Sequence, residues 1–393
     1  MFELDQQDRE AMVAFLRDMV CIPSFSTREQ EMAERLAAEM ERVGFHDVRL
    51  DRIGNVVGRI GAGSGPVLLL NGHMDVVGPG DLSTWQHDPF GAQIENGVLY
   101  GRGSADMKGA LAAMVYGAKT LIDRQVPLHG ELYMVGVVQE EPCEGLGMRI
   151  LVEEEDVIPD YVILGEATGL QISRGQRGRI ELKVTSRGRS CHASAPERGQ
   201  NAIYSAARLI FGIEMLSSQL AHDRFLGPGT LAVTQIENTG GSRNVVPDSC
   251  SFIIDRRLTL GETESKALAE VQSVLLREEV DAALEVSEYN STSFTGYNAQ
   301  HKCYYPAWAL DRDHPLIRRV SKAIRSELGF RPEIGKWDFS TDGVYTMGVA
   351  GIPTLGFGPG QEKYAHTADE RIRLSDVASA AQGYARIATE VLG

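Results

Sequence analysis

The 393-residue sequence predicts an α/β protein in which a mixed, mostly parallel sheet is flanked by helices and a smaller domain is inserted. Short apolar runs alternate with segments of helical spacing, which is typical of a sheet covered on both faces. From residue 178 the pattern changes to half-exposed strands, and after residue 290 helical spacing returns. A chain of this length usually builds more than one core. We therefore expect residues 1–177 and 291–393 to form one domain and residues 178–290 to form a second.

Local patterns predict the elements of the larger domain. "TREQEMAERLAAEMERVGF" has helical spacing, with Thr27 as a candidate cap and Gly44 as a stop. "HPLIRRVSKAIRSELGF" and "SDVASAAQGYARIATEVL" predict two further helices, with the apolar run "GIPTLGFG" between them. We also expect a helix at 107–123 and strands at 67–70, 131–138 and 161–164.

The inserted segment begins with "GRIELKVTSRG", which alternates like a strand, and continues with a helix pattern over 201–221. Two strands, a helix and a last strand are then expected at 229–240, 249–259, 262–281 and 283–289. The resulting order, β-α-β-β-α-β, is that of a ferredoxin-like unit.

The composition indicates which binding partners and which cellular compartment to expect. A formal net charge of −15 disfavours nucleic acid and anionic membranes as partners. The sequence contains no apolar window of membrane-spanning length, and its N-terminal segment lacks the basic start and apolar core of a signal peptide. The five cysteines are odd in number, scattered and without a CxxC pair, which favours reduced thiols and a cytoplasmic protein.

Polar side chains follow several of the expected strands. In "VLLLNGHMDVV", His73 and Asp75 come directly after an apolar run, and residues two apart in a strand share a face. The Asp75 carboxylate could therefore orient the His73 imidazole, as in many metal sites, although a lone histidine there is more often structural.

Five more candidates occupy comparable positions, and together they favour a shared site over a lone structural histidine. "VVQEEP" places Glu140 and Glu141 after a strand, and "VILGEATG" does the same for Glu166. Asp106 in "GRGSADMKGA" begins a helix, and His366 in "YAHTADE" follows the last apolar run. Ligands of open α/β sheets bind at the carboxyl ends of the strands.

Gathered at one such edge, these carboxylates would repel one another unless cations neutralised them. Mixed histidine and carboxylate ligands suit zinc, and also cobalt or manganese. Glu144 lies as close to its strand as Glu141 and could compete with it for this role.

The motifs "NGHMDVV", "GRGSADMKGA", "QEEP", "LGEAT" and "YAHTADE" resemble those of the M20 metallopeptidase family in their order and context. The resemblance spans nearly the whole chain and includes "CHASAPERGQNAI" and "GGSRNVVPD" of the inserted segment. The family contains acetylornithine and succinyl-diaminopimelate deacylases, aminoacylases and a carboxypeptidase. The wording is most similar to a branch of selenium-metabolism-linked hydrolases.

The resemblance implies a di-zinc exopeptidase-like catalytic domain, with the inserted domain acting in dimerisation and as a lid. In this family pattern His73 and Glu166 would hold one metal ion and Glu141 and His366 the other. Asp106 would bridge the two ions, which would be zinc, or else cobalt or manganese.

The resemblance also implies roles outside the metal ligands. Asp75 would orient His73, Glu140 would be the general base, and His192 of a partner subunit would reach the developing oxyanion. Asn244 and Arg257 would bind a substrate carboxylate, whereas from sequence alone Arg257 would be expected to pair with Asp255 or with a surface acid.

Three residues depart from the family pattern. Gln139 and Pro142 flank the two glutamates where relatives commonly have Asp and Gly, so the turn itself could differ. Met107 replaces a second Asp of several relatives, with little expected consequence.

The implied activity is hydrolysis of an amide bond in a small N-acyl amino acid or peptide-like molecule by a homodimer. A dipeptidase, an aminopeptidase or a carbamoyl-amino-acid hydrolase would use the same site. A catalytically silent binding protein is the alternative from another class, and loss of a motif residue would be its sign; every motif residue is present.

Overall fold

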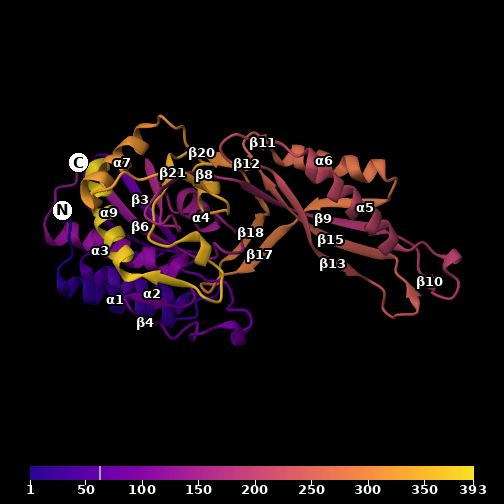
Figure 1. The fold of residues 1–393 in the computed structure, drawn as a ribbon, viewed down its shortest axis with the longest axis horizontal. Coiled ribbons are helices and arrows are strands. Elements are labelled where there is room, and N and C mark those ends of the chain that lie inside the picture. Colours follow the sequence, from indigo (N-terminus) through magenta and orange to yellow (C-terminus); the bar gives the residue numbers. More distant parts are fainter. Residues whose placement is uncertain (62) are drawn as a thin grey trace.

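The computed structural model describes residues 1–61 and 63–393, which form a helix-flanked sheet and an elongated second part (Figure 1). A nine-stranded sheet runs in the order β1-β2-β6-β3-β7-β22-β8-β20, with β21 also paired to β8. Its central pairs, β6 with β3, β3 with β7 and β7 with β22, are parallel. In chain order these strands are β1 (His46–Leu50), β2 (Val56–Ile60), β3 (Val67–His73), β6 (Glu131–Val137), β7 (Tyr161–Leu164), β8 (Ile172–Gln176), β20 (Trp308–Ala309), β21 (Ile334–Trp337) and β22 (Thr354–Gly356).

Helices cover both faces of this sheet, as the alternation of side chains along β3 illustrates. Leu68 and Leu70 belong to one apolar core, whereas Leu69 belongs to another on the opposite face. The first core includes side chains of α1 (Gln6–Cys21), α2 (Gln30–Val43), α3 (Gly109–Asp123), α7 (Pro315–Leu328) and α9 (Leu374–Leu392). The second includes side chains of α4 (Leu146–Glu154) and α8 (Gly343–Thr346). This mixed sheet with flanking helices confirms the predicted α/β class.

The elongated part contains β9 (Gly178–Arg187), α5 (Ala202–Leu216), β13 (Thr230–Asn238), β15 (Ser249–Leu258), α6 (Glu264–Arg277) and β16 (Ala282–Val286). The strands pair in the order β13-β15-β9-β16, all antiparallel. In β9 the residues Ile180, Leu182 and Val184 face α5 and α6 and form a separate apolar core. The intervening residues of β9, Arg179 among them, therefore lie on the other face of this sheet.

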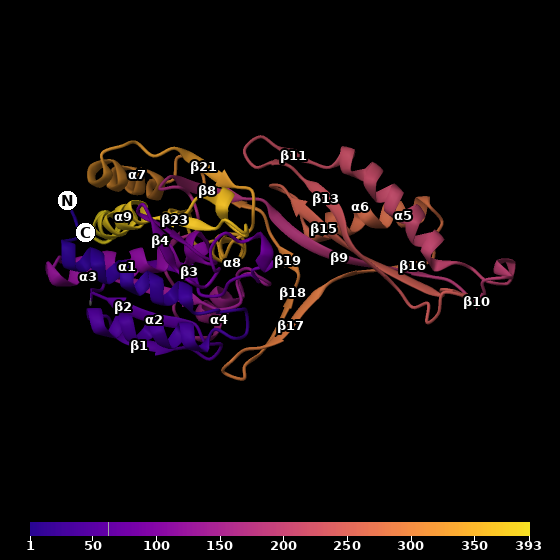
Figure 2. The ribbon, with the colours of Figure 1, turned by 60° about the horizontal axis from the view of Figure 1, so that its bottom comes forward.

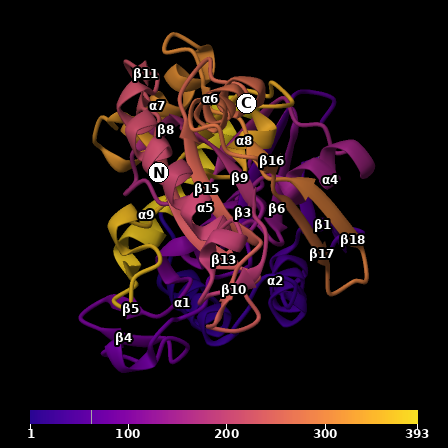
Figure 3. The ribbon, with the colours of Figure 1, turned by 90° about the vertical axis from the view of Figure 1, so that its right-hand side faces the viewer.

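A hairpin joins the elongated part back to the helix-flanked sheet (Figure 2). It consists of β17 (Glu288–Thr292) and β18 (Asn298–Lys302), and β19 (Tyr304–Tyr305) after it pairs with β9. Viewed along the long axis, β17 and β18 lie to one side of the strands β9 and β15 (Figure 3). Two short pairs complete the elongated part: β10 (Cys191–His192) with β14 (Val245–Val246), and β11 (His222–Asp223) with β12 (Gly227–Pro228).

Two local expectations differ from the structure. The second helix begins at Gln30, and Glu29 occupies the position before it, so Thr27 is not the N-cap. The Glu29 carboxylate instead accepts the N–H of Thr27. The sequence predicts that Asp106 begins a helix, but α3 begins at Gly109. The strand before Asp106 is β5 (Val98–Tyr100), which belongs to a small sheet with β4 (Gln93–Glu95) and β23 (Arg371–Arg373), outside the main sheet. Within the described ranges, none of the helices has the length and apolar character needed to cross a bilayer.

Candidate active site

His73 is the last residue of β3, at the carboxyl end of a central parallel strand, and it is almost fully buried. Its Nδ1 lies 2.8 Å from the backbone oxygen of Asp75, which leaves Nε2 facing the neighbouring carboxylates. The Asp75 carboxylate is farther away, at 3.7 Å from Nδ1. The main chain of Asp75 therefore makes the hydrogen bond that orients His73, whereas the sequence suggested its side chain.

The Asp75 carboxylate instead holds the turn that carries the two glutamates. It accepts the N–H of Glu140 at 3.1 Å and the N–H of Glu141 at 3.2 Å, and a hydroxyl of Ser26 at 2.7 Å. Because these bonds come from successive backbone amides, they fix the direction in which each glutamate side chain leaves the turn.

Five predicted ligands come together in two groups that share Asp106. His73, Asp106 and Glu166 present ligand atoms within 4.8 Å of one another, and so do Asp106, Glu141 and His366. One oxygen of Asp106 lies 3.0 Å from His73 Nε2, and the other lies 3.3 Å from His366 Nε2. The two carboxylate oxygens thus point to different histidines, an arrangement that suits a carboxylate bridging two cations.

Asp106 reaches this position through an irregular turn, because the backbone of Asp106 and Met107 is non-helical ahead of α3. The N–H groups of Ala105 and Asp106 both donate to Glu370 at 3.1 Å, and Arg102 pairs with the same carboxylate at 2.5 Å. Glu370 belongs to the "YAHTADE" motif, but nothing in the sequence pattern assigned it a role. It is a buried support for the shared ligand.

The charges of the site show why cations fit it. Burial raises the pKa of Glu140 and of Glu166 well above the usual carboxyl range. Hydrogen bonds that the His366 ring donates to the carboxylates of Asp106 and Glu141 raise the pKa of His366 to about 10. Among the described residues, Glu140 Oε1 and Glu166 Oε2 are buried without a hydrogen-bond partner. Carboxylates crowded in this way favour a positive charge beside them, so the donor set fits divalent cations.

Gln139, one of the residues that depart from the family pattern, precedes the two glutamates in a turn. Gln139 adopts a left-handed backbone, with φ 57°. Its side-chain oxygen accepts hydroxyls of Tyr289 at 2.9 Å and Ser291 at 2.6 Å, both from the hairpin. An amide at this position therefore connects the hairpin to the turn of Glu140 and Glu141.

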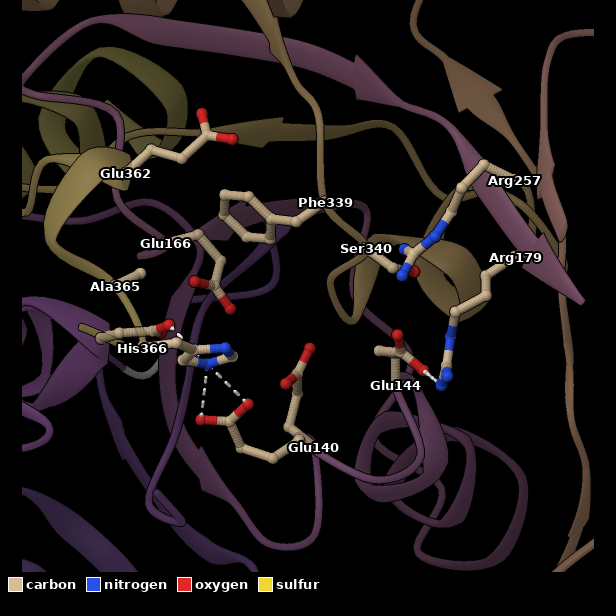
Figure 4. A pocket seen from close by; sticks show the side chains of 12 residues that line it. Glu140, Glu144, Glu166, Arg179, Arg257, Phe339, Ser340, Glu362, Ala365 and His366 are labelled. Carbon is tan, nitrogen blue, oxygen red and sulfur yellow. Dashed lines mark hydrogen bonds and ion pairs between the residues drawn. The ribbon is translucent and has the colours of Figure 1, made fainter. Parts of the chain in front are cut away.

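A cavity of about 370 Å³ opens onto these residues (Figure 4). Glu140 lines it but belongs to neither ligand group. Arg257 lines it from β15 of the elongated part, while also pairing with Asp255 at 2.8 Å. Sequence reasoning missed Arg179 and Phe339, which line the same cavity from β9 and from the segment after β21.

Glu144 lies in the cavity wall but takes no part in either ligand group of the described residues. It pairs with Arg179 at 2.7 Å instead. Of the two glutamates, Glu141 is therefore the one that lies beside His366 among the candidate metal ligands.

The structure does not bring His192 and Asn244 of the same chain to the cavity. His192 pairs with Val245 at the far end of the elongated part, and the backbone oxygen of Asn244 accepts the Ala193 N–H there at 2.8 Å (Figures 1 and 2). Both side chains are exposed, and His192 Nδ1 is 2.7 Å from the Ser194 hydroxyl.

Known proteins resemble this chain over almost its full length. Residues 69–390 match the family described as Peptidase family M20/M25/M40. An Escherichia coli (strain K12) protein named "Uncharacterized protein YgeY" is 41% identical over 376 residues, covering 96% of this chain and 93% of the relative. "Succinyl-diaminopimelate desuccinylase 2" of Ruegeria sp. (strain TM1040) is 28% identical over 396 residues, covering 97% and 95%.

Among solved structures, the M20 family metallo-carboxypeptidase Sso-CP2 from Sulfolobus solfataricus superposes with a TM-score of 0.78. The two sequences are 18% identical, and 99% of each chain is covered. Fold and site together define a hydrolase that acts on amide bonds. The chain belongs to the M20 peptidase family.

Proposed function

We propose that this protein is a two-metal hydrolase that releases an amino acid from a small N-acyl amino acid or similar amide. The observation that carries the proposal is the pair of ligand groups joined by Asp106, with Glu140 beside them on the cavity but in neither group. A buried carboxylate left out of metal binding is placed to move protons.

The residues present fit two divalent cations, zinc first and cobalt or manganese as alternatives. His73, Glu166 and Asp106 would hold one cation, and Asp106, Glu141 and His366 the other. When bound, such cations supply a water that loses its proton near neutral pH and polarise the amide carbonyl.

Glu140 would accept the proton of that water and later deliver it to the leaving nitrogen. The C–N bond breaks, and the products are a carboxylate and an amine. Burial, which raises the pKa of Glu140, favours the proton-holding form that this shuttle needs between its two transfers. Arg257 would hold a carboxylate of the substrate, because a guanidinium binds carboxylates in a two-point manner.

We also propose a C₂ homodimer in which His192 and Asn244 of one subunit complete the site of the other. Two observations support this. Both residues lie far from the cavity of their own chain, and the inserted domain has an exposed apolar face. Tyr204, Phe211 and Met215 of α5 are 72%, 68% and 65% exposed, and β13 beside them is a sheet edge.

Mixing two inactive variants tests the shared site. His192→Ala and Glu140→Ala dimers should exchange subunits and regenerate one intact site per mixed dimer, with part of the activity recovered. Mixing His192→Ala with itself is the control. Confirmed exchange without recovered activity would exclude the crossing of His192 between subunits.

Substrate assays separate the proposed activity from its alternatives at the same site. Metal-loaded protein should hydrolyse N-acyl amino acids faster than dipeptides or carbamoyl amino acids of the same leaving group. Faster release from dipeptides would favour a peptidase. Absence of hydrolysis throughout the panel, with both metals bound, would leave a binding protein as the better interpretation.

A further inference from the structure

A second cavity, of about 760 Å³, opens where the elongated part meets the helix-flanked sheet. Its walls come from β8, from α7 and the segments on either side of it, and from the loop between β11 and β12. The β11–β12 hairpin reaches back from the elongated part to β8, β20 and α7 (Figures 1 and 3). Of the described residues, none lines both this cavity and the active site, so a ligand here would be separate from the substrate.

Four arginines line this cavity, although the whole chain carries a formal net charge of −15. They are Arg174 of β8, Arg312 before α7, Arg318 of α7 and Arg331 after it, and Glu333 is the carboxylate among the lining residues. Within the described part of the chain, none of the four forms an ion pair with a carboxylate. Like charges gathered at one place repel one another, so the cavity favours an anion.

Uncharged groups hold these guanidiniums in place. Nη1 of Arg174 donates to the backbone oxygen of Leu310 at 2.7 Å, and Nη1 of Arg318 donates to the backbone oxygen of Asp313 at 2.6 Å. The guanidinium carbon of Arg174 also lies 3.6 Å from the centre of the Phe225 ring, which comes from the β11–β12 loop. Such partners fix a guanidinium without cancelling its charge, and they leave further N–H groups for a ligand.

Two acidic residues act on the charge of Arg174, but backbone amides engage both of them. Asp223 accepts two N–H groups of its own loop at 2.7 Å each, and Asp311 accepts one N–H at 2.7 Å. Burial lowers the pKa of Arg174, the charge of Arg312 lowers it further, and the two carboxylates only partly oppose this effect. The protein therefore does not fully neutralise its own positive charge at this place.

The start of α7 adds to the positive potential. The helix begins at Pro315, and its first turn contains no acidic residue. The N-terminus of a helix carries partial positive charge and usually has acidic neighbours, whereas here Arg312 precedes it and Arg318 follows within the first turn. Ser321, about one turn further along, contributes a hydroxyl to the same wall. The backbone and the side chains thus favour the same kind of ligand.

We infer that this cavity is a binding site for a small polyphosphate anion, the chain of either inorganic triphosphate or a nucleoside triphosphate. A guanidinium group binds phosphate oxygens at two points, so several guanidiniums suit several phosphates in one molecule. A long polyanion would extend beyond the cavity over the surface of a strongly acidic chain, which would repel it. Bound there, the anion would join α7 to the β11–β12 loop.

Hydrogen–deuterium exchange with inorganic triphosphate as the probe tests this inference on the full chain at low ionic strength. Triphosphate also binds metal cations, so the location of the protected amides is the readout. In the wild-type protein, exchange should become slower at 222–228 and 312–334 as triphosphate is added. In a variant that combines Arg312→Gln with Arg331→Gln, half-maximal protection should require about tenfold more triphosphate, or an even higher concentration, because hydrogen bonds to charged groups are lost. Both arginines are exposed, so these changes should leave the fold intact.

Arg319→Gln is the matched control. It removes an exposed arginine of α7 that lines neither cavity, and it should respond to triphosphate as the wild type does. Adenosine triphosphate distinguishes the two sources of the chain. Protection by both anions supports recognition of the phosphates alone, and protection by adenosine triphosphate alone supports a nucleoside triphosphate.

Four results would overturn the inference. They are no protection by either anion, equal protection in the double variant, the same protection by sodium chloride at matched ionic strength, and protection by poly-glutamate but by neither phosphate compound. The last result would indicate an acidic polypeptide as the partner of this surface.

Discussion

Replacing Glu140 and Glu141 one at a time separates a proton carrier from a metal ligand. The two residues are adjacent in sequence, and each donates a backbone hydrogen bond from its N–H to Asp75. Their side chains nevertheless differ in position, since only Glu141 lies within a ligand group, at 3.0 Å from His366 Nε2.

The expected metal content follows directly from the grouping. Wild-type protein should bind two cations per chain, because there are two groups. Glu140→Ala should still bind two, whereas Glu141→Ala should keep one, held by His73, Asp106 and Glu166. Loss of general acid–base catalysis should lower kcat of Glu140→Ala by roughly 10²- to 10⁴-fold.

Elemental analysis of dialysed protein, combined with steady-state kinetics, measures both quantities. Glu34→Ala, at an exposed position of α2, is the control for a lost carboxylate elsewhere in the domain. One cation in Glu140→Ala and two in Glu141→Ala would show that the roles are reversed. Two cations in both variants would show that the grouping around His366 does not describe the metal centre.

Four further predictions address metal, substrate, packing and pH. Chelation should abolish activity, and zinc, cobalt or manganese should restore it, as measured by assay after metal removal and reloading. Arg257→Gln should lower kcat/KM for substrates with a free carboxylate by roughly 10- to 100-fold, which is the scale of a hydrogen bond between charged groups. The wild-type enzyme should hydrolyse the corresponding amides poorly. Gly356→Ala should lower the free energy of unfolding in denaturant titrations by about 1–3 kcal/mol or more, because its Cβ would lie 2.0 Å from the buried ring of Trp337. Burial raises the pKa of Glu39, but hydrogen bonds from Arg42 and other partners more than offset this effect and lower the pKa below 4.5. The wild-type protein should therefore be more stable than Glu39→Gln above pH 4.5, and this advantage should disappear as the pH falls through the lowered pKa.

Each of these predictions has its own control. Full activity of verified metal-free protein would contradict a metal-dependent reaction, and equal turnover of acids and amides would contradict carboxylate binding. Gly335→Ala changes the same residue type on β21, where an added Cβ meets nothing within 4 Å, and it should leave stability nearly unchanged. An advantage over Glu39→Gln that stays constant with pH would exclude the lowered pKa as its source.

Much of the fold and of the metal ligands follows from local sequence. Buried parallel strands are short apolar runs, and the ligands of such sheets follow the runs directly, so the sequence alone predicts His73, Glu141 and Glu166 at one edge of the sheet. The helix stop at Gly44 is equally local, and the structure shows Gly44 at φ 97° after α2.

Contacts between distant segments are beyond the reach of such patterns. Asp106 follows a strand of a separate small sheet, and its position depends on Glu370, 264 residues away in the chain. Glu144 and Glu141 follow the same strand, but Glu144 pairs with Arg179 of β9, whereas Glu141 lies 3.0 Å from His366 Nε2. Periodicity describes which face a residue takes within its own element, whereas ion pairs between domains depend on how whole elements pack. The sequence by itself therefore determined the residue types of the site, and the tertiary structure alone decided which carboxylate lies in a ligand group and which pairs with an arginine.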